Sequence, residues 1–295
     1  MILQAGGKDD HRVLALDART GATAWSSKGV ERTSQASAVV ADLGNVRQVV
    51  AHQVRVAEAQ ASGLVGLRLA DGAVLWSTVL EKNVSLETPV VLPGDRLLLL
   101  TWNDAHVFSL ERQGESITPR RVWSSLDLLA DVSPPVYHDG HLYGFGGDNL
   151  TCLEAATGKK LWEYATDNYV NGTPAVDGGG GERVVFGGCD AVLHVVDGAS
   201  GAALERIELG EACHVAGSVA LAGGRAYFGH YGNAFVCVDL ESRETLWRVT
   251  DPDQAFFSSP AVAPERVVFG GRNKRVHCAE RATGAATSAT NSRQR

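Results

Sequence analysis

The chain has 295 residues, of which 44% are hydrophobic and 21% charged, and its formal net charge is -7. This balance is typical of a soluble globular protein and excludes the disordered and membrane classes. Acidic residues are scattered among basic ones without a Lys/Arg stripe, so the sequence argues against a nucleic-acid partner and against an anionic membrane surface. The longest apolar runs are broken by turn residues and fall short of the about 20 apolar residues of a transmembrane helix, so we expect no transmembrane segment.

The first residues, "MILQAGGKDD", carry neither the charged n-region nor the apolar h-region of a secretory signal. This start is typical either of a cytoplasmic protein or of a sequence whose first part lies upstream.

One pattern recurs along the chain: a strand, a tight turn and a second strand that usually ends in tryptophan. It begins with "VLALDARTGATAW" and "LVGLRLADGAVLW", and it continues through "LTCLEAATGKKLW", "LHVVDGASGAALE", "FVCVDLESRETLW" and "VHCAERATGAATS". A further unit, "HVFSLERQGESITPRRVW", has an insertion between its turn and its tryptophan. The turn positions are 21, 72, 114, 158, 201, 243 and 284, which give steps of 41 to 51 residues and seven units. The residues that define the repeat are Gly21, Trp25, Gly72, Trp76, Trp123, Gly158, Trp162, Gly201 and Trp247.

Two other segments complete each period. A short motif such as "TPVV", "TPAV" or "SPAV" precedes every unit after the first, and an aromatic, β-branched segment such as "RVVFGGCD" follows it. Each period therefore holds four short strands, and no segment has a helical period. Four strands in about 40 to 50 residues are typical of a β-propeller blade, so we predict an all-β propeller of about seven four-stranded antiparallel blades.

The turn and the tryptophan have structural interpretations. Glycine takes the positive φ that a bulged hairpin requires, so Arg243, which replaces it in one unit, predicts a strained turn. The tryptophan four residues later is large enough to fill the gap between adjacent blades, with about 200 Å² of buried surface.

A strand, an Asp or Glu, a Thr-Gly turn and a tryptophan resemble the repeat of the quinoprotein-like propellers, often called PQQ repeats. The resemblance extends from about Val13 to Gly284. The group includes quinone-dependent alcohol and sugar dehydrogenases, the propeller lipoprotein of the outer-membrane assembly machine and bacterial propellers without enzymatic activity. Fold alone does not decide between these functions.

The resemblance implies that an enzyme of this group would hold pyrroloquinoline quinone (PQQ) with an adjacent cysteine pair or an equivalent stacking surface, a stacking tryptophan, a calcium or similar ion on Glu and Asn, and an Asp base. The sequence has no Cys-Cys pair, and Trp102 is the one tryptophan outside the repeat position. We therefore expect no cofactor and no catalytic residues, with PQQ and calcium only if the alternative of a dehydrogenase, or a fragment of one, holds.

Other candidate sites have simpler interpretations. Cys152, Cys237 and Cys278 share one repeat position and are expected to pack as small apolar residues. The remaining cysteines lack zinc-ligand spacing, and the histidines at 138 and 141 flank an Asp-Gly hairpin, so we expect no metal site.

The connections between the last strand of one blade and the first strand of the next are the expected ligand-binding positions, because in a propeller they meet at the mouth of the channel. The candidate rim residues are Gln35, Glu87, Asp131, Tyr169, Asn171, His214 and Phe257. Such side chains suit a small polar ligand, a cation or a peptide, or they are solvated groups that line the channel.

The two ends depart from the repeat. The first unit lacks the "TPVV"-type strand, and the last continues into the polar segment "AATSATNSRQR", so we expect a propeller that is incomplete at one or both ends. We predict one propeller domain over residues 1–284 and a polar tail or truncated strand over 285–295.

The combined prediction is a non-catalytic propeller that binds or scaffolds a protein partner or a small ligand. The resemblance implies an exported, periplasmic protein of bacteria. A cytoplasmic location is the alternative that the N-terminus leaves open.

Overall fold

The computed structural model describes residues 1–5, 13–30, 36–55, 61–80, 87–129, 133–178, 182–210 and 212–291. These residues form strands and turns and contain no helix, which confirms the predicted all-β class. Accordingly, no helix in these ranges has the length and hydropathy needed to cross a membrane. Gln35 and Asp131, two of the candidate rim residues, lie outside the described residues.

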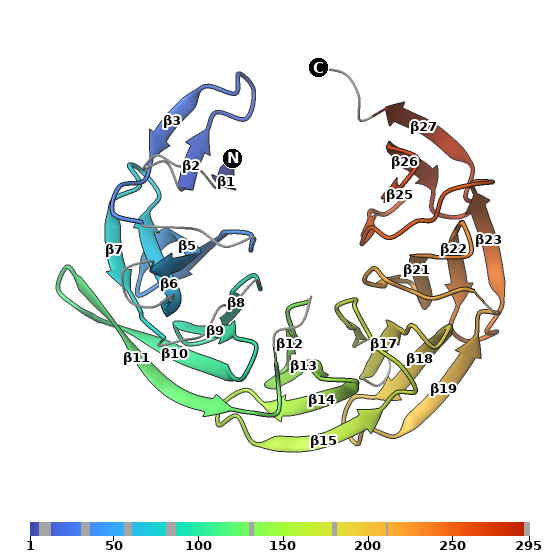
Figure 1. Cartoon of the computed structure of the whole chain (residues 1–295), viewed down its shortest axis with the longest axis horizontal. Coiled ribbons are helices and arrows are strands. Elements are labelled where there is room, and N and C mark those ends of the chain that lie inside the picture. The colour runs from blue at the N-terminus through green and yellow to red at the C-terminus, as the bar shows by residue number, and fades with distance from the viewer. Residues whose placement is uncertain are drawn as a thin grey trace. The chain divides into compact units, whose positions relative to one another are not determined.

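The chain divides into two compact units. The first comprises Met1–Tyr137 and Glu154–Lys159, and the second comprises His138–Leu153 and Lys160–Arg295. The described residues form seven antiparallel sheets, one of three strands and six of four (Figure 1). Sequential four-stranded antiparallel sheets are the blades of a propeller, so the predicted fold class is confirmed.

The first unit contains three sheets. They are β1 (Ile2–Gln4), β2 (Val13–Leu16) and β3 (Thr23–Ser26); β4 (Val39–Leu43), β5 (Val46–Arg55), β6 (Ala61–Arg68) and β7 (Val74–Ser77); and β8 (Val90–Leu92), β9 (Arg96–Leu100), β10 (Ala105–Gln113) and β11 (Ser116–Ser125). The first sheet has three strands in the described residues, in keeping with the missing "TPVV"-type motif. The long β10–β11 hairpin holds the insertion of the third unit.

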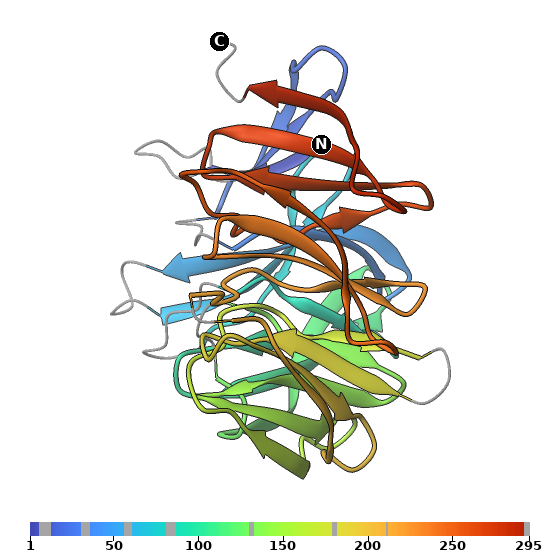
Figure 2. The same ribbon diagram turned by 90° about the vertical axis from the view of Figure 1, so that its right-hand side faces the viewer.

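The second unit contains three complete sheets and most of a fourth. They are β12 (Val136–His138), β13 (His141–Gly146), β14 (Asn149–Glu154) and β15 (Lys160–Ala165); β16 (Ala175–Asp177), β17 (Arg183–Gly187), β18 (Val192–Asp197) and β19 (Ala203–Glu208); β20 (Ala220–Ala222), β21 (Arg225–His230), β22 (Ala234–Asp239) and β23 (Thr245–Thr250); and β24 (Ala261–Val262), β25 (Arg266–Gly271), β26 (Arg275–Glu280) and β27 (Ala286–Asn291). Figure 2 shows these sheets as successive layers from green through yellow and orange to red.

The last strand, β27, covers part of the segment for which the sequence predicts a polar tail or truncated strand. It pairs with β26 from Arg275↔Asn291 to Ala279↔Ala286. Polar residues therefore continue the ladder here, since the backbone supplies the hydrogen bonds and the outer strand of a blade needs few apolar side chains.

The tryptophan of one sheet packs on the turn glycine of the next sheet. A Cβ atom at Gly72 would lie 2.5 Å from the Trp25 indole, and one at Gly201 would lie 2.7 Å from Trp162. Each indole N–H also donates to a carbonyl three residues before that glycine: Trp25 to Leu69 (2.9 Å), Trp123 to Ala155 (3.2 Å), Trp162 to Gly198 (3.0 Å) and Trp247 to Arg281 (3.0 Å). Glycine is thus required at the repeated turn for two reasons: the backbone has a positive φ, and the tryptophan ring leaves no room for a Cβ atom.

Trp76 departs from this arrangement. Its indole N–H donates to Oε1 of Gln48 on its own sheet (2.6 Å), and its ring packs against Gly66. At the next turn glycine, Gly114, a Cβ atom would have no neighbour within 4 Å, because this residue lies at the tip of the long β10–β11 hairpin. The insertion therefore removes the surface on which Trp76 would pack.

The sheet pair β16–β19 and β20–β23 has no tryptophan between its outer strands. Glu205 occupies the tryptophan position of β19, and Arg243 occupies the glycine position of the following turn. The two side chains form an ion pair. Arg243 has a φ of 64°, so the predicted strain at this turn is present.

The "TPVV"-type motifs also connect neighbouring sheets. The backbone N–H of Thr173 donates to the Ser218 hydroxyl (2.9 Å), and the N–H of Ser218 donates to the Ser259 hydroxyl (3.2 Å). In the first unit the N–H of Ser37 donates to the Thr88 hydroxyl (3.2 Å). A hydroxyl residue recurs in the motif because it accepts the hydrogen bond of the preceding repeat.

Candidate ligand-binding rim

Three connections of the second unit are fixed by one buried apolar residue each. Val170, Val215 and Phe256 are at most 4% exposed. The glycines opposite them allow this insertion: a Cβ at Gly187 would lie 2.5 Å from the Val215 side chain. Burial of the anchor leaves its sequence neighbours at the surface, and these neighbours include Tyr169, Asn171, His214 and Phe257.

Tyr169 and Asn171 are tied to the neighbouring loop through Cys189. The N–H of Cys189 donates to the Tyr169 carbonyl (2.8 Å), and Nδ2 of Asn171 lies 3.6 Å from the Cys189 sulfur. The Tyr169 side chain is 62% exposed. Burial, followed by the charge of Asp190, raises the pKa of the Cys189 thiol, so this sulfur is protonated at neutral pH.

His214 continues the same chain of contacts. Its ring nitrogen Nδ1 bonds to the Cys189 carbonyl, and its own carbonyl accepts the N–H of Tyr231 (2.9 Å). The rings of His214 and Tyr231 meet edge to face at 6.1 Å. An imidazole held at Nδ1 by a carbonyl presents its other nitrogen to solvent.

An aromatic and cationic group completes the rim. The rings of Tyr231 and Phe257 lie 4.2 Å apart, and the Arg272 guanidinium lies 5.4 Å above the Phe257 ring. This is the distance of a cation–π contact, and it leaves the guanidinium N–H groups available to a ligand. Tyr231 is 49% exposed, so the group forms a surface rather than a core.

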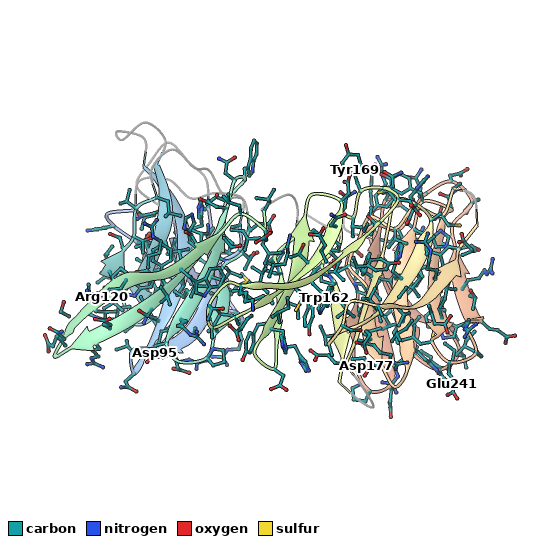
Figure 3. The ribbon with its side chains drawn as sticks, turned by 90° about the horizontal axis from the view of Figure 1, so that it is seen from below. Asp95, Arg120, Trp162, Tyr169, Asp177 and Glu241 are labelled. Atoms are coloured by element: carbon teal, nitrogen blue, oxygen red, sulfur yellow. The ribbon has the colours of Figure 1, made fainter. Side chains whose placement is uncertain are left out.

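We call the set Tyr169, Asn171, Cys189, His214, Tyr231, Phe257 and Arg272 the aromatic rim. Figure 3 places Tyr169 at one end of the second unit, and Asp177 and Glu241 at the other. The aromatic rim therefore belongs to the end opposite these acidic residues.

The sequence predicts four members of the aromatic rim as ligand-binding residues: Tyr169, Asn171, His214 and Phe257. It does not predict the other three: Cys189, Tyr231 and Arg272. Cys189 is a free thiol, and its backbone links two loops. Tyr231 and Arg272 escape the sequence prediction because they lie in the turns between the second and third strands of their sheets, whereas that prediction concerns the connections between sheets. An exposed aromatic residue in "GHYGN" is the signal that could have found Tyr231.

The first unit contributes less to the candidate site. Glu87 is 4% exposed, so its carboxylate lies in the interior of this unit and offers no open ligand position. His52 is completely buried, and neither of its ring nitrogens has a hydrogen-bond partner within the described residues. Burial lowers the pKa of His52 to about 4, so the ring is neutral at physiological pH.

A buried polar network lies next to the aromatic rim. The Tyr164 hydroxyl bonds to Nδ1 of His194 (3.1 Å), and Nε2 of His194 bonds to the Asp190 carboxylate (2.9 Å). Phe186 stacks on the imidazole at 4.7 Å. Burial lowers the pKa of His194 although Asp190 opposes the shift. Because every polar atom of the ring is paired, the network positions the Cys189–Asp190 loop.

The cofactor that the resemblance implies can be compared with these residues. Calcium requires several oxygen ligands around one point. In the described ranges no three His, Cys, Asp or Glu side chains converge in this way, and the two cysteines near the aromatic rim are free. The described residues thus contain neither a cluster of three such side chains nor the adjacent cysteine pair that the resemblance implies for a PQQ site.

Repeated four-stranded blades joined by tryptophan and glycine, with an aromatic rim on the blade connections, define a propeller of the PQQ-repeat class. The family model described as outer membrane protein assembly factor BamB matches residues 1–98, 104–204 and 180–289. The chain therefore belongs to this family.

Solved structures show the same fold at low sequence identity. BamB from Moraxella catarrhalis is 16% identical with a TM-score of 0.68, over 99% of this chain and 84% of that one. Sqt1 of Saccharomyces cerevisiae is 11% identical with a TM-score of 0.73, over 95% and 79% of the two chains. Quinohemoprotein alcohol dehydrogenase from Comamonas testosteroni is 11% identical with a TM-score of 0.68, over 98% and 65%. No curated protein sequence matches the chain.

Proposed function

We propose that the protein is a non-catalytic scaffold that binds a protein partner through the aromatic rim. The observation that carries the proposal is the series of ring contacts from His214 through Tyr231 to Phe257, with the Arg272 guanidinium over the Phe257 ring. The exposed Tyr169 is tied to this series through the backbone of Cys189. Tyrosine, phenylalanine and arginine are enriched at protein interfaces. The aromatic rings bury a large area there at a low cost in side-chain entropy.

The charges of the aromatic rim favour a partner segment with apolar and acidic side chains. Arg272 makes no ion pair within the described residues, and its guanidinium N–H groups can donate to a ligand. The His214 ring donates from Nδ1 to the Cys189 carbonyl, so its other nitrogen can accept a hydrogen bond. A carboxylate of the partner would pair with the Arg272 guanidinium while an apolar side chain packs on Tyr231 and Phe257.

The family membership also supports a protein-binding function. Its name refers to the assembly of outer membrane proteins, and the propeller from Moraxella catarrhalis carries the same name. By this relation we propose that the protein works outside the cytoplasm of a bacterium, on protein partners rather than on nucleic acid, without a bound cofactor.

Site-specific photocrosslinking tests the proposal. A benzoylphenylalanine residue in place of Tyr231 or Phe257 is expected to form adducts with one protein in cells, whereas the same residue at Glu241, at the opposite end of the unit, is not. Equal adduct formation at all three positions would contradict a partner site at the aromatic rim.

Calorimetric titration with PQQ, with and without calcium, tests the alternative of a dehydrogenase. We expect no binding heat. Calcium-dependent binding in the micromolar range, followed by dye reduction with alcohols or sugars, would overturn the proposal in favour of an enzyme.

A further inference from the structure

A cavity of about 190 Å³ lies between the sheets β16–β19 and β20–β23, where the repeat lacks its tryptophan. The cavity reaches from Arg243 and Thr245 to Cys213 and His230. At four other interfaces the indole packs on the turn glycine at this place in the repeat, whereas here the ion pair of Glu205 and Arg243 replaces both residues. The cavity is therefore built by two linked departures from the repeat.

The strand register decides which side chains face the cavity. Val236 pairs with Arg248, Ala234 with Thr250 and Val238 with Thr245. Val236, Ala234 and Val238 belong to the core that packs against β16–β19. Since cross-strand partners share a face, the side chains of Arg248, Thr250 and Thr245 project toward the same space.

The charge facing the cavity is positive. Arg248 makes no ion pair within the described residues, and Arg243 is neutralised by Glu205. Glu208 also lines the cavity. It follows Ile207, whose side chain belongs to the core shared with β20–β23, and side chains alternate along a strand. The Glu208 side chain therefore lies on the opposite face of β19. The carboxylate of β19 that projects toward β20–β23 is that of Glu205, and it is paired with Arg243 rather than with Arg248.

His230 supplies a second donor. It is 7% exposed, and its Nδ1 accepts the N–H of Gly232 (3.0 Å), which assigns the proton of the neutral ring to Nε2. Nε2 has no hydrogen-bond partner in the part of the chain that the structure describes. Burial, together with the charge of Arg248, lowers the pKa of His230, in keeping with a neutral ring close to that guanidinium.

The rest of the lining is apolar or weakly polar. Ile207, Leu209 and Val236 form an apolar wall, and the Cys213 sulfur lies 3.0 Å from the position of a Cβ at Gly232. The volume is smaller than the about 300 Å³ of common ligand pockets, which limits the ligand to a few heavy atoms.

We propose that this cavity binds a small organic carboxylate, whose oxygens accept hydrogen bonds from Arg248 and from Nε2–H of His230 while its short apolar body packs on Ile207 and Val236. The site adjoins the aromatic rim in sequence, because Cys213 and His230 directly precede the rim residues His214 and Tyr231. It is independent of the protein-binding function proposed above.

The proposal is tested by titration of the whole chain with sodium butyrate at constant ionic strength, followed by NMR of the Gly232 amide that donates to His230. We expect saturable shifts with a Kd of about 1 mM, the affinity of a good ligand with about six heavy atoms. Butylamine and 1-butanol, which have the same chain without the carboxylate, are expected to bind at least about tenfold more weakly.

Two variants form a matched pair. Arg248→Gln is expected to weaken butyrate binding at least about tenfold, whereas Arg206→Gln, whose side chain lies on the opposite face of β19 and pairs with Asp167, leaves it unchanged. No saturable shift up to about 20 mM butyrate, equal binding of butylamine, or equal Kd values for the two variants would each overturn the proposal.

A third variant fills the cavity. Glu205→Trp combined with Arg243→Gly restores the residues of the other repeats, so the indole is expected to occupy the outer part of the cavity and abolish butyrate binding. Binding that persists in this folded double variant would contradict the assigned location. If the double variant does not fold, the comparison of Arg248→Gln with Arg206→Gln decides the proposal.

Discussion

Two interfaces between sheets of the second unit occupy the same place in the repeat and are built from opposite chemistry. Between β23 and the last sheet, Trp247 packs on Gly284 and donates its indole N–H to the Arg281 carbonyl. Between β19 and the next sheet, Glu205 pairs with Arg243. Both partners differ together, which shows that the unit of change is the contact across the interface and not the single residue.

The tryptophan interface should carry most of the stability. Trp247 is 8% exposed, so Trp247→Ala is expected to reduce the free energy of unfolding by about 3 to 5 kcal/mol through lost burial and the cavity left behind. Denaturant unfolding measures the loss. Trp102→Ala is the control, because this ring is 60% exposed and its removal should cost less than about 0.5 kcal/mol.

Buried histidines provide the same contrast between a paired and an unpaired position. His194 bonds to Tyr164 and Asp190, whereas His52 has no partner within the described residues and burial lowers its pKa to about 4. The unfolded chain, with a pKa of about 6.5, binds a proton before the folded protein does. The stability is therefore complete above about pH 6.5 and falls by about 3 kcal/mol as the pH drops toward 4.

Denaturant unfolding at several pH values measures this dependence. His52→Leu removes the group that titrates. Between about pH 6.5 and about pH 4, the free energy of unfolding of this variant should therefore fall less steeply with pH, by the slope that corresponds to about one proton. Parallel curves for the two proteins would show that His52 does not cause the acid sensitivity.

Two turn glycines allow the effect of the positive φ to be measured separately from the effect of the contact with a tryptophan ring. Gly21 and Gly284 have φ values of 72° and 73°, but Gly21 has no atom within 4 Å of a Cβ position, whereas Gly284 has the Trp247 ring at 2.6 Å. Gly21→Ala should cost about 1 kcal/mol from backbone strain alone. Gly284→Ala should cost about 2 to 3 kcal/mol, because the ring must also move. If denaturant unfolding gave the same loss of unfolding free energy for both variants, the contact of Gly284 with Trp247 would not explain the requirement for glycine.

The ion-pair interface should respond least. Arg243→Gly removes an exposed ion pair, worth about 0 to 1 kcal/mol, and at the same time relieves the positive φ of a residue with a Cβ atom. We expect a net change within about 1 kcal/mol in the same unfolding measurement. A loss above about 2 kcal/mol would mean that this pair supports the interface as strongly as a tryptophan does.

The blade pattern could be predicted because a local signal recurs: the turn glycine and the tryptophan need the same geometry in every repeat. The insertion before Trp123 was also visible, but its effect on Trp76 was not, since that effect depends on where the hairpin tip ends in space. The pairing of Glu205 with Arg243 joins residues 38 positions apart. A strained turn at Arg243 could be read from one residue, whereas its partner required the register of two sheets.

The candidate site was predictable to a smaller extent. Tyr169, His214 and Phe257 lie in connections whose position follows from the blade order. Tyr231 and Arg272 join them only through ring contacts across two hairpins, and these contacts depend on side-chain directions that no sequence spacing specifies. The cavity is harder to predict from the sequence, because it lies where Glu205 replaces the tryptophan of the other repeats.

The contact of each tryptophan with the following turn has a consequence for how such a chain can evolve. Since a repeat supplies the ring for its successor and the glycine for its predecessor, a duplicated or deleted repeat finds matching neighbours at once, and the number of blades can change without new interfaces. The boundary between Glu205 and Arg243 is one exception, and the boundary after Trp76, whose indole bonds to its own sheet, is another. Recombination within the boundary of Glu205 and Arg243 would place a carboxylate over a glycine or a tryptophan over an arginine, so these two repeats are expected to be inherited as a pair.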